Sequence, residues 1–127
     1  MRNGTIIGLA VLLVAMATGC HTTVTNLTPS QQVRNKAGMY PLSVAWDSNQ
    51  QSLQEETIDA SVQVGLQTYP MQATPLVKSR WETLVPVPAD QSLLNYRFKF
   101  DYETLGMPHR RQNSRLSPPY QLKIIDP

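Results

Sequence analysis

The sequence predicts an all-β fold, an antiparallel β-sandwich of about seven strands, and three observations lead to it. Apolar residues recur at every second position in several short runs, which is the period of a strand with one buried face. Ten prolines and six glycines are scattered without a repeat, as expected for turns and edge strands. No part of the chain beyond its N-terminal region shows the period of an amphipathic helix.

The chain begins with a segment typical of export. Arg2 supplies a positive charge, and residues 6–16 form a largely apolar stretch of signal-peptide length that is short for a transmembrane helix. The stretch is followed by Ala-Thr-Gly-Cys at residues 17–20. We therefore expect residues 1–19 to be a signal peptide that is removed.

Residues 17–20 resemble the lipobox of bacterial lipoproteins, whose cysteine receives a diacylglyceryl group before the chain is cleaved on its N-terminal side. The resemblance implies that Cys20 becomes the first mature residue and carries diacylglyceryl and N-acyl groups that anchor it in a membrane. Cys20 is the only cysteine and so has no internal disulfide partner, and lipidation caps its thiol. The competing interpretation is ordinary cleavage after Ala17, which would release a protein with a free thiol.

The same resemblance predicts a location in the bacterial cell envelope rather than the cytoplasm. Several acyl chains anchor a protein stably, whereas one chain holds it only marginally. In some lipoprotein families an Asp directly after the lipidated cysteine causes retention in the inner membrane, and this chain has His21 there. We therefore expect attachment to the outer membrane.

The remaining chain has the length of a single domain with one core. Residues 20–30 are expected to form the lipidated N-terminus and either a tether or a first strand, and residues 31–127 the sandwich. Basic and acidic side chains nearly balance, so no overall field favours nucleic acid as a partner.

In the first half of the domain, a short strand is expected near residues 23–27 and another at 68–73. Two longer runs, 40–47 and 58–67, alternate regularly between apolar and polar residues. Each run therefore predicts a strand with one face in the core. The expected inward residues are Tyr40, Leu42, Val44, Trp46, Ile58, Ala60, Val62, Val64 and Leu66.

In the second half, strands are expected at residues 81–87, 94–103 and 120–125. Pro86 and Pro88 lack an N–H, which places the end of the first of these strands at a sheet edge or in a turn. The second shows the clearest alternation in the chain. The expected inward residues are Trp81, Thr83, Val85, Val87, Leu94, Tyr96, Phe98, Phe100, Tyr102, Tyr120, Leu122 and Ile124.

Short strands separated by turns in a chain of this length are typical of an immunoglobulin-like antiparallel β-sandwich, with a small barrel as the alternative. Residues 81–90 and 96–100, Trp-Glu-Thr-Leu-Val-Pro-Val-Pro-Ala-Asp and Tyr-Arg-Phe-Lys-Phe, resemble the late strands of immunoglobulin-like modules, including starch-binding relatives. This resemblance implies a fold and no function. The chain as a whole resembles small bacterial lipoproteins.

One polar segment, residues 105–115, is expected to be the loop between the last two strands. It contains the candidate partner-binding residues His109, Arg110, Arg111 and Arg115. Its arginines suit an anionic partner such as a lipid phosphate, an envelope polysaccharide or an acidic protein patch. The alternative is charge balance with the acidic segment 47–56, which is expected at the same end.

The sequence offers little for catalysis or for a metal. Only His109 supplies an imidazole within the domain, and no serine lies in a nucleophile turn with a His and carboxylate arrangement. The acidic residues lack the spacing of zinc or calcium ligands. We therefore expect no catalytic residues, no metal and no cofactor.

Two functions are consistent with this sequence. The favoured one is a lipid-anchored structural or interaction module without catalysis, and the alternative is an envelope module that binds glycans. Glycan binding requires exposed aromatic rings, whereas the strand aromatics are expected in the core. Tyr40 and Tyr69 are less constrained by the pattern, so a surface position stays open for these two, and neither is taken as a ligand residue.

Overall fold

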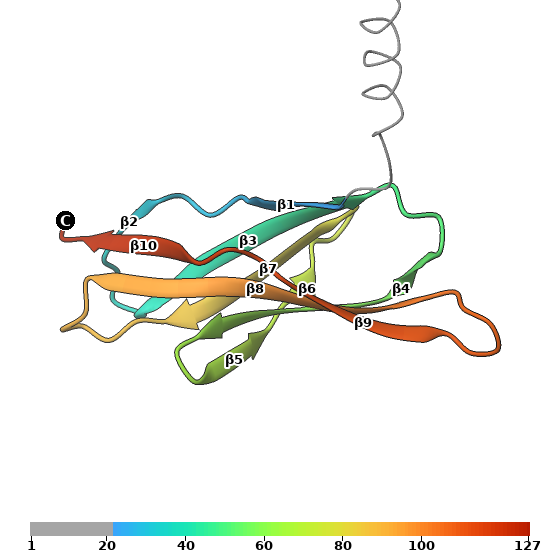
Figure 1. Ribbon diagram of the computed structural model, residues 1–127. Coiled ribbons are helices and arrows are strands. Elements are labelled where there is room, and N and C mark those ends of the chain that lie inside the picture. Colours follow the sequence, from blue (N-terminus) through green and yellow to red (C-terminus); the bar gives the residue numbers. More distant parts are fainter. Residues whose placement is uncertain (1–21) are drawn as a thin grey trace, which may run out of the picture.

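The computed structural model describes residues 22–127, so Cys20 and the expected signal peptide lie outside the part that can be compared. All regular structure in this range is β, and the strands form two sheets that pack face to face (Figure 1). No helix in this range is available to span a membrane.

The first sheet has the strand order β1-β3-β7-β6, and all its neighbours are antiparallel. The second sheet has the order β2-β10-β8-β4-β5, with β9 paired to β8 beside β10. All its pairs are antiparallel except β2 and β10. The strands of the first sheet are β1 (Thr22–Asn26), β3 (Met39–Ser48), β6 (Gln72–Ala73) and β7 (Arg80–Pro86). Those of the second are β2 (Gln31–Val33), β4 (Leu53–Val64), β5 (Gln67–Pro70), β8 (Leu93–Thr104), β9 (Arg111–Leu116) and β10 (Tyr120–Ile125).

This strand order is that of an immunoglobulin-like sandwich. In immunoglobulin nomenclature β1, β3, β7 and β6 take the places of strands A, B, E and D, and β4, β8 and β10 take those of C, F and G. β5 adds a strand beside C, and β2 lies parallel to β10 at the far edge. The expected fold class is confirmed, and the small-barrel alternative is wrong.

The core is built from the side chains that the alternating pattern places inward. All of the expected inward residues of β3 and β8 are buried or half-buried, and Leu42, Val44, Val62, Phe98, Phe100 and Leu122 have no exposed surface. Leu66 was expected in the core and is instead fully exposed. It follows Gly65 in the β4–β5 turn, where the chain leaves the strand at a positive φ of 58°.

Tyr40 lies on the expected inward face of β3 and is buried, with 1% of its surface exposed. Its hydroxyl accepts a hydrogen bond from the Asn35 backbone N–H at 3.1 Å. The ring therefore packs in the core, while its hydroxyl gives a backbone N–H of the β2–β3 connection a hydrogen-bond partner.

The short strand expected near residues 23–27 is present as β1, Thr22–Asn26. Two other segments differ from the expectation. The single strand expected at residues 68–73 is divided between the two sheets as β5 and β6, with the buried Met71 at the crossing. The Met71 N–H donates to Ala60 O at 2.9 Å, which continues the β4 ladder up to the crossing.

The second difference concerns residues 105–115, which were expected to form one loop. Only the first part is a loop, because Arg111–Leu116 forms β9 along the distal half of β8. β9 and β10 together make one interrupted strand beside β8. At the interruption the Phe98 N–H donates to Ser117 Oγ at 2.8 Å, and the Ser117 N–H donates to Phe98 O at 2.9 Å.

Candidate functional site

One end of the sandwich brings together the start of the described chain and three connections, and we call it the N-terminal end. Thr22 pairs with Ser48 there, and Leu53 pairs with Thr104. The connections are residues 49–52, 74–79 and 105–110, and this end lies on the right in Figure 1. The acidic segment 47–56 and the β8–β9 loop therefore share one end, as the sequence predicts.

Arg110 is held by carboxylates of its own chain. Its Nη1 lies 3.3 Å from Glu103 Oε2 and 3.7 Å from Glu56 Oε1. The Arg110 side chain is about half exposed, so each pair contributes roughly 0 to 1 kcal/mol. For this arginine the charge-balance interpretation is confirmed.

Arg111 and Arg115 lie on the opposite face of the β8–β9 hairpin from Glu103. They pair across the strands with Thr104 and Phe100, whose side chains face the core. Both arginines are exposed, on a hairpin that extends from the sandwich (Figure 1). Within residues 22–127 no carboxylate lies within ion-pair distance of either guanidinium.

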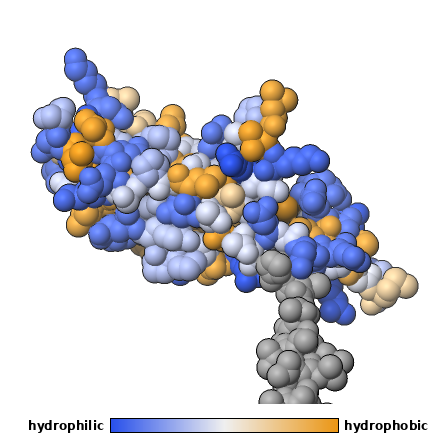
Figure 2. All heavy atoms as spheres, turned by 90° about the horizontal axis from the view of Figure 1, so that it is seen from above, coloured by the Kyte–Doolittle hydropathy of each residue, from blue (hydrophilic) through white to orange (hydrophobic). Residues whose placement is uncertain are grey.

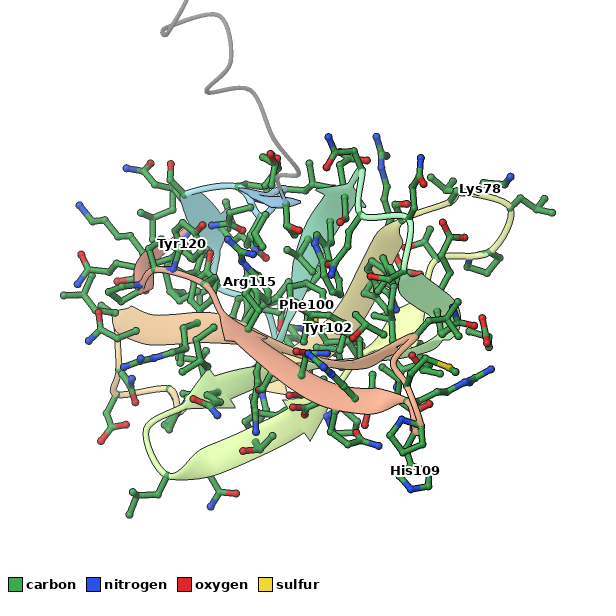
Figure 3. The ribbon with its side chains drawn as sticks, turned by 45° about the vertical axis from the view of Figure 1, so that its right-hand side comes forward. Lys78, Phe100, Tyr102, His109, Arg115 and Tyr120 are labelled. Atoms are coloured by element: carbon green, nitrogen blue, oxygen red, sulfur yellow. The ribbon has the colours of Figure 1, made fainter. Side chains whose placement is uncertain are left out.

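The structure thus divides the four predicted residues into separate groups. Arg111 and Arg115 share one face of β9, Arg110 turns to the acidic side, and His109 lies at the loop tip, away from the body of the domain (Figure 3). The sequence places them in one loop, where faces are undefined. Arg111 and Arg115 share a face because both belong to β9, whereas Arg110 precedes this strand.

A cleft of about 560 Å³ opens at the same end and was not predicted from the sequence. It is bordered by residues of both sheets, among them Trp46 and Trp81 from the first and Leu53 and Ile58 from β4. β4 loses its regular pairing with β8 between Gln54 and Asp59, and Glu55 and Ile58 of this irregular stretch border the cleft. No pattern in the sequence signals this irregularity.

The irregular part of β4 is held by one hydroxyl. Thr57 Oγ1 donates to Gln54 O at 2.6 Å and accepts from the Glu103 N–H at 2.8 Å. It therefore replaces the strand-to-strand bond that the bulge removes. The buried Trp46 Nε1 beside the cleft has no hydrogen-bond partner within residues 22–127.

No aromatic side chain within residues 22–127 is exposed. Trp46, Phe98 and Phe100 are buried, and Tyr69, Trp81, Tyr102 and Tyr120 are half-buried against the same core. The exposed aromatic strip that would favour glycan binding is therefore not present on the described strands. Within the same range no group of three His, Cys, Asp or Glu side chains converges as metal ligands would.

The strand order and the exposed hairpin define the class of this protein as an immunoglobulin-like β-sandwich. No known protein family matches the sequence, and no curated protein matches it either. Among solved structures the chain is similar to murine CRIg, with a TM-score of 0.44 and 9% identical residues, over 84% of this chain and 98% of that one. The fold class rests on the strand order and not on this likeness.

Proposed function

We propose that this protein is a lipid-anchored module of the bacterial cell envelope that acts in binding or assembly without catalysis. The observation that carries the proposal is the position of Cys20, at the end of a lipobox-like segment and two residues before β1. Lipidation there would attach a folded sandwich to a membrane almost directly. His21 after the cysteine supports the outer membrane as the site of attachment.

The short connection supports an anchor that holds the sandwich close to the bilayer. Thr22 already pairs with Ser48, and two residues of chain span at most about 7 Å. The N-terminal end of the domain would therefore lie at the membrane surface. The hairpin of β8 and β9 extends from the sandwich (Figure 1) and would be available to a partner.

Arg111 and Arg115 supply the chemistry that we propose for that partner. Two exposed guanidinium groups without a carboxylate partner in the described chain suit an envelope polysaccharide or an acidic protein patch. Figure 2 shows the side of the molecule that is at the top of Figure 1, where hydrophobic residues are scattered among hydrophilic ones and form no broad apolar patch. Glycan binding through aromatic stacking is the weaker proposal, because the aromatics of residues 22–127 are turned into the core.

Replacing Cys20 with alanine should abolish lipid labelling and release the protein from the membrane fraction. Without the thiol there is no atom to receive the diacylglyceryl group, and no other cysteine can replace it. The measurement is incorporation of an alkyne fatty acid into the chain in bacteria, followed by fractionation. His21→Ala is the matched control and should keep the label, whereas label that persists in Cys20→Ala would overturn the anchor.

Replacing Arg111 and Arg115 together with serine should reduce recovery of the partner several-fold after cross-linking in the envelope. The same change should move the unfolding midpoint little, because both side chains are exposed. Arg110→Ser is the control, since its charge is neutralised by Glu103 and Glu56. Equal recovery with the double variant, the control and the native protein would remove these arginines from the interface.

A further inference from the structure

The β6–β7 loop, residues 74–79, contains a leucine whose side chain is not packed in the core. Leu76 is fully exposed, and its backbone has a φ of 62°, in the left-handed region. A bulky side chain is rarely found there because the conformation is strained. Ser79 has a φ of 63°, so the same loop contains two such residues.

The loop is nevertheless defined by hydrogen bonds at both of its ends. The Thr74 N–H donates to Arg80 O at 2.9 Å, and Ser79 O accepts from the Trp46 N–H at 3.0 Å. These contacts fix where the loop leaves the first sheet. A strained backbone that is held in place and presents a leucine to solvent points to a use outside the fold.

The loop lies at the same level of the sandwich as the start of β1. β3 pairs with β1 through Thr22 and Ser48, and it pairs with β7 through Ala45 and Arg80. Neighbouring strands are about 4.8 Å apart, so β7 runs about 10 Å from β1. A bilayer that holds Cys20, two residues before Thr22, would therefore lie within reach of this loop.

The chemistry of the loop suits the boundary between phospholipid headgroups and acyl chains. Val77 beside Leu76 is also exposed, and Lys78 and Arg80 follow. Within residues 22–127 neither cation forms an ion pair, and Lys78 projects from the edge of the domain (Figure 3). Apolar side chains enter such a boundary while lysine and arginine remain beside the phosphates.

We propose that the β6–β7 loop inserts Leu76 into the surface of the membrane that holds Cys20. This inference rests on the proposed lipid anchor and adds a second contact beside it. Two contacts fix the orientation of the sandwich, with the N-terminal end at the membrane and the β4–β5 turn pointing away.

The test uses single-cysteine labelling of the full mature chain in proteoliposomes. Leu76→Cys and Leu66→Cys each add one free thiol to a protein whose only native cysteine would be lipidated. The two leucines are matched, since both are fully exposed in turns, at opposite ends of the sandwich. Each variant carries the same environment-sensitive dye, in vesicles of phosphatidylethanolamine and phosphatidylglycerol that contain a quencher on the acyl chains.

The dye at residue 76 should be quenched several-fold more than the dye at residue 66. A second measurement, protection from trypsin, tests the same contact without a dye. Trypsin should cut after Lys78 more slowly in the membrane-bound native protein than in Leu76→Ser, and detergent should remove this difference. Equal quenching at both positions, or equal cleavage of the two proteins, would overturn the inference.

A missing lipid anchor can be distinguished from a missing loop contact. The native protein would then react with a maleimide at Cys20, and its mass would lack the acyl groups. Where Cys20 carries the lipid and both dyes are quenched equally, the anchor stands and the loop contact is wrong.

Discussion

Phe100→Ala should lower the free energy of unfolding by about 3–5 kcal/mol. The Phe100 side chain has no exposed surface, and its ring lies 4.7 Å from the Trp46 ring and 5.7 Å from that of Trp81. The two tryptophans belong to the first sheet and Phe100 to the second, so this cluster joins the two layers. Replacing the Phe100 ring with a methyl group removes both of these ring contacts.

The cavity would close only in part. Trp46 also packs against Tyr102, at 4.8 Å between ring centroids, and cannot move toward the vacated space without losing that contact. A loss of 3–5 kcal/mol is roughly a fifth or more of the stability of an ordinary domain. It corresponds to a fall of about 15–30 °C in Tm for a domain of this size.

Urea unfolding of Phe100→Ala measures the effect, with Leu84→Ala as the control. Leu84 is about half exposed on β7, so its truncation should cost no more than about 1 kcal/mol. If Phe100→Ala does not fold, Phe100→Leu should remain folded with a smaller loss, about 1–2 kcal/mol. Equal midpoints for the Phe100 and Leu84 variants would show that Phe100 does not occupy the core.

The sequence predicts the strands whose two faces meet different surroundings. β8 has Phe98 and Phe100 against the other sheet and Asn95 and Arg97 in water, and this contrast is what creates the alternation. β3 shows the same contrast. Such strands can be recognised without knowing their partners, because their own residues alternate between apolar side chains for the core and polar side chains for the solvent.

β9 has no such signal, because all of its residues except the exposed Leu116 are polar and only Asn113 is half-buried. Its structure comes from the backbone ladder with β8, in which Arg111 pairs with Thr104 and Leu116 with Lys99. β2 is similar, since its three residues are a strand only because β10 lies beside them. Strands defined by a partner and not by burial cannot be identified from their own residues.

The arrangement of the candidate site also depends on strand pairing, which the sequence does not reveal. The arginines of residues 110–115 can be found by composition, but their division between two faces follows from the register of β9 with β8. The cleft beside Trp46 depends on the lost pairing of β4. Leu76 can be seen in the sequence as an apolar residue next to a proline, and only its backbone and exposure distinguish it from a core leucine.

Ser117→Ala should lower the free energy of unfolding by about 1–3 kcal/mol, because a buried backbone donor loses its partner. Ser117 has 5% of its surface exposed, and its Oγ accepts from the Phe98 N–H and donates to Pro118 O at 2.8 Å. Pro118 and Pro119 have no N–H to offer β8. The hydroxyl therefore carries the ladder across the interruption between β9 and β10.

Ser114→Ala, an exposed change on β9, is the matched control and should lie within about 0.5 kcal/mol of the native protein. Hydrogen exchange adds a local reading, since the Phe98 amide should exchange faster in Ser117→Ala and at the native rate in Ser114→Ala. A Phe98 amide protected equally in both variants would mean that another group accepts its hydrogen bond. Faster exchange would establish that the side chain of Ser117 supplies the bond to β8 at the interruption between β9 and β10.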